Sequence, residues 1–216
     1  MKRLATLLVF AAWLGGCGLS PQTVQMEPAP DVESANVGHN AAVLVTVDDQ
    51  RERDEIGTRG GIYAETSLLR PANKVDEALL GAIQRGLQNQ GFNAFNPGGD
   101  ATRLQVALTE LSYKPEDSSV VNRVEVGAEL EVRAERPEAD YTGRYRSTIR
   151  HDQPFTPSAR RNETLLNDVM NRALNRMLAD NKLLAFLAGE DEPEGADEDA
   201  DGGEDSDNGE AEADGT

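Results

Sequence analysis

Four stretches of the chain carry apolar residues in patterns typical of β-strands. Residues 41–47 form a continuous apolar run, so that both faces of an extended chain are apolar there. Such a run predicts a central strand covered over at least most of both sides. A second strand is predicted where Leu104, Val106 and Leu108 alternate with polar residues.

The third and fourth strands are the clearest, and their charges predict how they pair. Apolar and charged residues alternate over residues 124–135 and again over residues 141–150, and residues 136–139 supply a turn between them. Opposite charges across a strand pair contribute roughly 0.2–1 kcal/mol, and like charges cost a similar amount. We therefore expect Glu135 to face Asp140, and not the register that sets Arg133 against Arg144. The expected register makes three oppositely charged pairs: Glu131–Arg144, Glu129–Arg146 and Glu125–Arg150.

Two segments have the spacing of amphipathic helices. In the first, Asn73 is a predicted N-cap, and Gly91 is the predicted left-handed residue after the helix, followed by Phe92 as the apolar contact of a Schellman motif. The second is expected to begin at Thr156-Pro157. Its apolar stripe is Leu165, Leu166, Val169, Met170, Ala173, Leu174, Met177 and Leu178, followed by Leu183, Leu184, Phe186 and Leu187.

The predicted order β-α-β-β-β-α indicates an α+β fold. We expect a small two-layer sandwich in which a mixed sheet of about four strands carries two packed helices. The connection through the first helix should be a right-handed crossover between parallel strands, and the later strands should form a meander.

Composition sets the boundaries of the folded part. Residues 1–16 have the charged, apolar and small-residue regions of a signal peptide. We expect residues 17–40 to be a lipidated N terminus and flexible linker, which would hold a single domain at residues 41–188 typically ~25 Å from the bilayer. Residues 189–216 are expected to be a disordered acidic tail. The net charge of −18 argues against nucleic acid as a partner.

Cys17 is the only cysteine, and it ends the tetrad Leu14-Gly15-Gly16-Cys17. This tetrad resembles the bacterial lipobox, a leucine, two small residues and a cysteine, in which the thiol is lipidated. Cleavage would then fall between Gly16 and Cys17, and the acyl chains would make Cys17 a membrane anchor. The alternative is a plain secretory signal in which the cysteine falls there by chance.

Several stretches resemble the YajG-like lipoproteins of Gram-negative bacteria over residues 1–188. The matching stretches are Val45-Thr46-Val47-Asp48-Asp49-Gln50-Arg51 with Ile56-Gly57, the helix ending in Gln90-Gly91-Phe92, and the strand with Leu104, Val106 and Leu108. The resemblance implies an outer-membrane lipoprotein whose domain faces the periplasm and has no established activity. Gly18, not aspartate, follows the cysteine, which by the sorting rule of enteric lipoproteins favours the outer membrane.

The candidate interaction site is the connection over residues 48–70, which is long for a compact domain and leaves the end of a predicted strand. Its candidate contact residues are Asp49, Arg51, Arg53, Gly57, Arg59, Gly60 and Gly61. The alternative is a solvated loop whose acidic and basic residues pair with one another.

Catalysis, cofactors and metals find little support in the sequence. His151 lies beside Asp152, but no nucleophile motif marks a serine partner, and no phosphate-binding loop is present. Asp197, Asp199 and Asp201 match only the first half of a calcium loop, so we expect no metal site.

These observations lead to one main functional expectation. We expect a non-enzymatic outer-membrane lipoprotein with a periplasmic interaction domain, anchored by lipid and able to bind an envelope protein or peptidoglycan. The first alternative is an accessory factor that regulates peptidoglycan synthesis, an analogy that rests on fold alone. A periplasmic hydrolase is the remote alternative.

Overall fold

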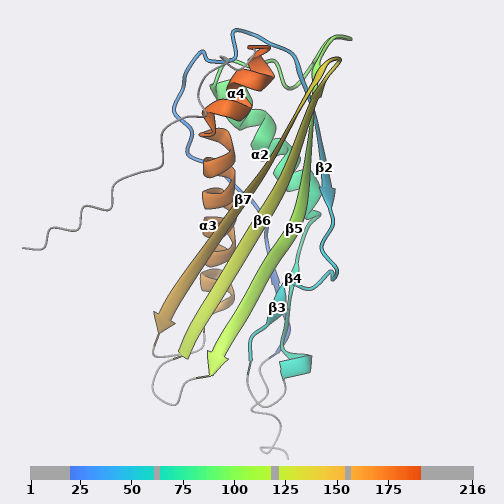
Figure 1. The fold of residues 1–216 in the computed structure, drawn as a ribbon. Coiled ribbons are helices and arrows are strands. Elements are labelled where there is room, and N and C mark those ends of the chain that lie inside the picture. The colour runs from blue at the N-terminus through green and yellow to red at the C-terminus, as the bar shows by residue number, and fades with distance from the viewer. Residues whose placement is uncertain (1–19, 61–63, 118–121, 154–156, 191–216) are drawn as a thin grey trace, which may run out of the picture.

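The protein has two layers, a long twisted sheet and a set of helices packed against one of its faces (Figure 1). The computed structural model describes residues 20–60, 64–117, 122–153 and 157–190. Within these ranges the sheet has seven strands, and three α-helices cover it. The α+β class is confirmed, whereas four strands and two helices were too few.

The strands added to the expected set are short and come from segments that were expected to be irregular. The elements in chain order are β1 Gln22–Val24, β2 Val43–Asp49, β3 Gly57–Thr58, the 3-10 helix η1 Ala64–Thr66, β4 Leu68–Pro71, α2 Val75–Asn89, β5 Thr102–Asp117, β6 Asn122–Arg136, β7 Ala139–Gln153, α3 Ala159–Leu178 and α4 Asn181–Ala188. The sheet order is β1-β4-β3-β5-β6-β7, and β2 also pairs with β5.

Strand β2 is not the central strand that its apolar run predicts. It pairs in parallel with residues 102–108 of β5, the arrangement expected across α2, but no described strand lies on its other side. Val43 is fully buried against the helical layer, whereas Leu44 is 45% exposed on the opposite face. The run is apolar on both sides, but only one side is covered.

The hairpin of β6 and β7 has the register predicted from charge. Glu135 faces Asp140, and the three expected pairs Glu131–Arg144, Glu129–Arg146 and Glu125–Arg150 all form. Arg133 faces Thr142 instead of Arg144. Side-chain charge and the alternation of apolar residues therefore agree on one pairing, which is what strand register requires.

The end of α2 confirms the predicted Schellman motif, whereas both predicted helix starts are wrong. Gly91 has φ 87°, and the N–H of Phe92 donates to the carbonyl of Leu87 at 3.0 Å. Lys74 precedes α2 in the N-cap position, because Asn73 uses its amide for a contact elsewhere. Helix α3 begins at Ala159 after the N-cap Ser158, later than predicted.

The whole predicted apolar stripe of α3 is buried, and the apolar residues after it form the separate helix α4. The buried stripe consists of Leu165, Leu166, Val169, Met170, Ala173, Leu174, Met177 and Leu178. A four-residue repeat of apolar positions thus indicated correctly which side of the helix meets the sheet.

Residues 20–40 are not a flexible linker within the described part of the chain. Strand β1 pairs with β4, and Val24 and Met26 are fully buried. Val24, Met26 and Pro28 alternate as buried positions, a period-two signal that the flanking prolines and polar residues conceal in the sequence. The domain therefore begins near residue 20, about twenty residues before the expected boundary at 41.

The elongated domain has two distinct ends. At the β3 end, strand β3 and helix η1 lie near the last residues of β5 and β7 and the first residue of β6 (Figure 1). At the hairpin end, the turn between β6 and β7 lies close to α4, and Gly189 approaches Arg136. Strand β6 has 15 residues, so the two ends are separated by about 45 Å along the sheet.

Candidate functional site

Among the described residues, no element covers the face of the sheet opposite the helices, and charged side chains line this open face. Because side chains alternate along a strand, the residues between the buried positions of β6 and β7 all point to this open face. Acidic residues of β6 meet arginines of β7 across it, as in the pair Glu125–Arg150 at 2.7 Å and in Glu131 with Arg144. The open face thus carries many charges that neutralise one another.

Glu129 lies at the centre of this face and is buried. Its side chain is 8% exposed, and its carboxylate accepts a hydrogen bond from Nε of Arg146. Nε of Arg144 lies 3.6 Å away, and the hydroxyl of Thr109 donates to the same carboxylate at 3.4 Å. A buried carboxylate costs free energy unless it is paired in this way, so Glu129 acts as a structural centre of the open face.

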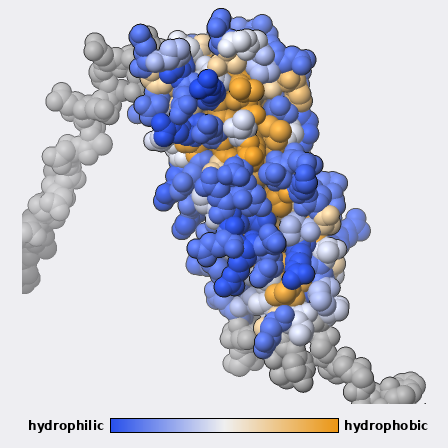
Figure 2. Space-filling view, turned by 90° about the vertical axis from the view of Figure 1, so that its right-hand side faces the viewer, coloured by the Kyte–Doolittle hydropathy of each residue, from blue (hydrophilic) through white to orange (hydrophobic). Residues whose placement is uncertain are grey.

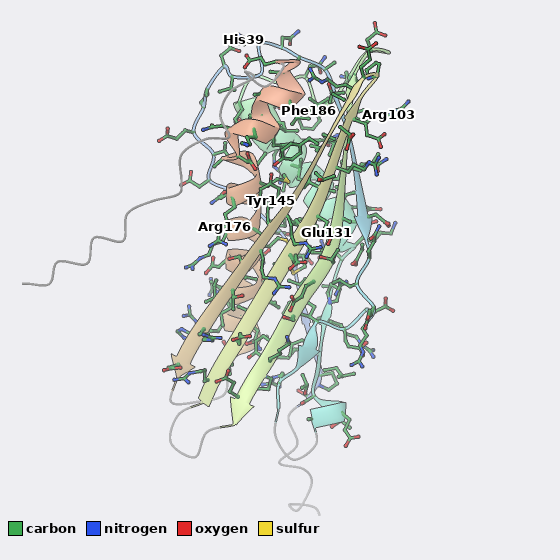
Figure 3. All side chains as sticks on the ribbon, viewed as in Figure 1. His39, Arg103, Glu131, Tyr145, Arg176 and Phe186 are labelled. Atoms are coloured by element: carbon green, nitrogen blue, oxygen red, sulfur yellow. The ribbon has the colours of Figure 1, made fainter. Side chains whose placement is uncertain are left out.

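A groove of about 780 Å³ crosses the open face from β2 to β7. The small side chain of Ala107 leaves room there. Glu131, another lining residue, lies in the upper half of the sheet in Figure 3. Its lining residues are Thr46, Val47, Asp48, Gln50, Gln105, Val106, Ala107, Glu131, Val132, Arg133, Thr142, Gly143 and Arg144. Four of these are charged, two acidic and two basic, so the groove has no net charge.

A second hollow of about 840 Å³ adjoins the groove at the hairpin end. It is more apolar, and Leu44, Ala101, Pro137 and Leu187 are among its lining residues. Figure 2 shows an apolar strip on the side of the molecule that carries β2, with polar side chains on both sides of it. The open face therefore combines a polar groove with an apolar margin along β2.

The segment predicted as the interaction site is more ordered than a loop. Two of its arginines, Arg51 and Arg59, have partners within the protein. Both oxygens of the Asp49 carboxylate accept hydrogen bonds from Arg51, at 2.8 and 2.6 Å, and the Arg51 side chain is 7% exposed. Arg59 donates to the carbonyl of Ser20 at 2.9 Å. The alternative of internal pairing therefore holds for Arg51, while Arg53 is exposed.

The structure explains why glycine occupies two positions of this segment. A Cβ on Gly57 would lie 2.1 Å from the carbonyl oxygen of Tyr113, because β3 approaches β5 closely at this point. Gly60 has φ 77°, a conformation that favours glycine. Gly61 lies outside the described residues, as do Gly16 and Cys17. Of the predicted segment, Asp48 and Gln50 reach the groove.

Among the described residues, the hydrogen-bond partner of His151 is an arginine and not a catalytic group. Its ring nitrogen lies 3.0 Å from the guanidinium of Arg161, and the neighbouring Asp152 pairs with Arg123 at 2.6 Å instead. Arg123 lowers the pKa of Asp152 through a hydrogen bond, although partial desolvation acts in the other direction. A histidine beside a cation is poorly placed to accept a proton from a nucleophile.

Two partly buried polar networks were not foreseen from the sequence. In one, the Asp180 carboxylate accepts hydrogen bonds from the hydroxyls of Tyr141 at 2.8 Å and Tyr145 at 2.7 Å and also caps α4. Burial raises the pKa of both tyrosines. Burial opposes ionisation of Asp180 as well, but the tyrosine hydroxyls and two backbone N–H groups outweigh it and lower its pKa.

The second network joins β5 to α3 and the N-terminal segment. The hydroxyl of Tyr113 donates to Asn162 at 2.8 Å, and both side chains are buried. Burial raises the pKa of Tyr113 to about 12. The Asn162 amide in turn lies 2.8 Å from the side chain of Gln22 in β1. Both networks are at least partly buried and connect different elements, so they serve the fold.

The described residues offer neither a metal site nor a membrane-spanning helix. Among them, no group of three histidine, cysteine, aspartate or glutamate side chains is placed to hold a metal ion. None of the described helices is long and apolar enough to cross a membrane. The half-matching calcium loop at Asp197, Asp199 and Asp201 lies outside the described part of the chain.

Comparison with known proteins gives one family match. The Lipoprotein_16 model, described as "Uncharacterized lipoprotein", matches residues 28–188. None of the curated proteins compared with the chain matches it.

Several solved structures are similar at low identity. Protein XCC0632 from Xanthomonas campestris is 11% identical, with a TM-score of 0.45 over 77% of this chain and 95% of that one. A protein from Caulobacter crescentus CB15, named as a candidate lipoprotein, is 15% identical, with a TM-score of 0.39 over 72% and 97%. A minor lipoprotein from Acinetobacter baumannii is 10% identical, with a TM-score of 0.35 over 68% and 91%.

Proposed function

Since the chain belongs to the family of uncharacterised bacterial lipoproteins whose model it matches over residues 28–188, we propose that it is a non-enzymatic binding protein anchored by lipid at Cys17. Its domain faces the periplasm from the outer membrane, as the lipobox and Gly18 suggest. The assignment to the narrower YajG-like group remains a prediction from the sequence. The binding surface in this proposal is the groove on the open face of the sheet.

One observation supports the groove above the other surfaces. It is the place where four strands, β2, β5, β6 and β7, present one continuous hollow that the helices leave uncovered. The hollow is open to solvent, which suits a segment of another macromolecule better than an enclosed small ligand. The groove is lined by equal numbers of acidic and basic residues, and the edge of the sheet beside it, along β2, is apolar.

The chemistry of the groove favours a protein partner. Glu131 pairs with Arg144, and Arg133 pairs with Glu135 at 2.7 Å, so an isolated anion or cation would have to displace an existing partner. A polypeptide, which carries both donors and acceptors, can add hydrogen bonds to Thr46, Gln105 and Thr142 without breaking those pairs. An envelope protein therefore fits better than a polyanion.

The peptidoglycan-synthase alternative is weakened by the packing of residues 20–40. A factor that reaches a distant partner through the cell wall needs a long flexible tether. Here β1 starts at Gln22, only five residues after Cys17. The domain would therefore stay near its own membrane, and its partner would have to come to it.

Site-specific crosslinking in intact cells tests the proposed surface. A photoreactive amino acid at Thr142, inside the groove, should yield an adduct with a distinct envelope protein. The matched control is Thr148, which lies exposed on the same strand and the same face, six residues away and outside the groove.

Filling the groove should then reduce that adduct. With a second photoreactive residue at Gln105, the substitution Thr142→Trp should lower the yield several-fold, and Thr148→Trp should leave it unchanged. Both variants should retain the thermal stability of the parent, because positions 142 and 148 are both exposed. Equal adducts from positions 142 and 148 would contradict the groove as the binding surface.

A further inference from the structure

The N-terminal segment runs along the whole length of the domain and begins at its β3 end. There the carbonyl of Ser20 accepts a hydrogen bond from Arg59, which follows β3, at 2.9 Å. At the hairpin end, the N–H of Ala35 donates to the carbonyl of Asn89 at the end of α2. The segment thus enters the fold at one fixed place, although its sequence has little regular pattern.

Residues 25–29, here called the strap, are fastened along α3 by a ladder of side chains. The N–H of Gln25 donates to Glu163 at 2.9 Å. In the same way, the backbone N–H of Glu27 donates to the side-chain oxygen of Asn167, and that of Ala29 donates to the side-chain oxygen of Asn171, each at 2.8 Å. Two residues of extended chain advance about 6.6 Å, and four residues of α-helix advance about 6.0 Å. The donors of the strap and the acceptors of α3 therefore stay opposite one another over several bonds.

The strap is held from its other side as well. The Asn73 amide accepts from the N–H of Met26 and donates to its carbonyl, both at 2.9 Å, and the Met26 side chain is fully buried. With the ladder along α3, the backbone N–H groups of residues 25, 26, 27 and 29 all have partners in the domain. A segment satisfied in this way behaves as part of the fold.

This fastening limits where Cys17 can be. Cys17 precedes Ser20 by three residues, so the two Cα atoms are at most about 11 Å apart in any conformation of the intervening chain. Cys17 must therefore lie close to the β3 end. The hairpin end is about 45 Å further along the sheet.

From this geometry we propose that the domain sits on the membrane with its β3 end against the lipid headgroups and its hairpin end directed away. The proposal rests on the lipid anchor at Cys17 in the proposed function. Helix η1 and the ends of β5 and β7 form the membrane-facing surface. The acidic tail, which follows Gly189 at the hairpin end, starts on the side away from the bilayer.

The partner at the β3 end is the bilayer surface itself, and the tether imposes the contact. Arg123 at this end pairs with Asp152 at 2.6 Å and lies 3.7 Å from Glu116, so its charge is neutralised locally. Attraction to anionic lipid is therefore not needed. The orientation should be the same on neutral and on anionic vesicles and should be insensitive to salt.

Energy transfer from the lipidated full-length protein to acceptor lipids measures the orientation. Because acylation occupies the only native cysteine, a cysteine introduced at Glu65 in η1 or at Glu138 in the hairpin turn is the single free thiol for a donor dye. Both positions are exposed. On vesicles of phosphatidylethanolamine and phosphatidylglycerol, transfer from position 65 should exceed that from position 138 roughly twofold or more, given their separation along the sheet.

Loosening the strap should narrow this difference, although β1 still pairs with β4. The double variant Asn167→Ala/Asn171→Ala deletes two acceptors of the ladder, so transfer from position 65 should fall toward that from position 138. The matched control Asp168→Ala/Arg172→Ala changes two exposed positions of the same helix and should leave transfer unchanged. Hydrogen exchange in detergent should show faster exchange at Glu27 and Ala29 only in the release variant.

The outcomes separate the orientation from the anchor. If the parent protein fails to float with vesicles, or its thiol carries no acyl group, the lipid anchor and the proposed function fail. If it floats but positions 65 and 138 transfer equally, the orientation is wrong although the anchor stands. If transfer changes with phosphatidylglycerol content, attraction to anionic lipid, and not the tether, sets the orientation.

Discussion

At the residue scale, several positions that resemble surface features have structural roles set by a close neighbour. Gly57 was a candidate contact residue because it lies in a charged, glycine-bearing segment. In the structure it is the point where β3 meets the backbone of β5, with no room for a side chain. Asp180 likewise looks like an ordinary helix cap, yet it also holds two tyrosines of β7.

The role of Gly57 predicts a large cost for one added methyl group. Gly57→Ala places a Cβ 2.1 Å from the carbonyl oxygen of Tyr113, so β3 must move away from β5. We expect a loss of about 1–3 kcal/mol in the free energy of unfolding, measured by urea denaturation. Gly98→Ala is the control, because a Cβ there meets nothing within 4 Å. Similar losses in both variants would mean that β3 is not tightly placed.

The lowered pKa of Asp180 predicts a pH-dependent contribution to stability. A carboxyl whose pKa is lower in the folded state stabilises the fold above its unfolded pKa of about 3.9, and this contribution is lost as pH falls through the folded value. Asp180→Asn keeps an acceptor for capping α4 but has no charge to lose. Between pH 7 and pH 3, the variant should therefore lose less stability than the parent. Parallel stability curves would contradict this assignment.

At the element scale, α3 holds together more of the molecule than its apolar stripe suggests. One face packs on β6 and β7, while the polar residues Glu163, Asn167 and Asn171 hold the strap. The hairpin of β6 and β7 is similarly two-sided. Its apolar face carries the helices, and its charged face is organised around the buried carboxylate of Glu129. In both elements the polar side makes contacts as well defined as those of the apolar side.

The burial of Glu129 predicts which arginine of the hairpin matters most. Arg146→Ala removes the main partner of a carboxylate that is 8% exposed, whereas Arg150→Ala removes the partner of Glu125, which is 25% exposed. We expect the first to lower Tm by a few degrees and the second to lower it by clearly less. Adding Glu129→Gln to Arg146→Ala should recover part of the loss, because no buried charge is then left unpaired. Equal shifts in Tm for the two arginine variants would contradict this view.

At the scale of the whole molecule, the proposed anchor and the proposed binding groove lie at different heights. Along β6, the groove at Val132 is ten residues from Asn122 at the β3 end, or about 33 Å. With the β3 end on the membrane, the groove stands above the lipid headgroups, where a partner in the periplasm can reach it. The crosslinking and energy-transfer experiments test the two ends of this arrangement separately.

The sequence by itself determined the features that depend on neighbours along the chain. Alternating charge specified the hairpin register, Gly91 and Phe92 specified how α2 ends, and the four-residue repeat specified the buried side of α3. Each of these results from a short periodic pattern. The tertiary structure alone decided the place of residues 20–40, because the strap bonds to residues 138 to 142 positions away, and no local pattern encodes such partners.

The same reason explains why β2 is not a central strand and why Arg51 and Arg59 have partners within the protein. Whether an apolar strand is central or lies at an edge depends on which strands pair beside it, and β2 meets only β5 among the described strands. In the sequence, Arg51 and Arg59 looked available to bind a partner. The residue that Arg59 contacts, Ser20, is 39 residues away, and the burial of Arg51 results from the fold. Local periodicity encodes strands and helices, whereas contacts distant in sequence decide which surfaces remain open.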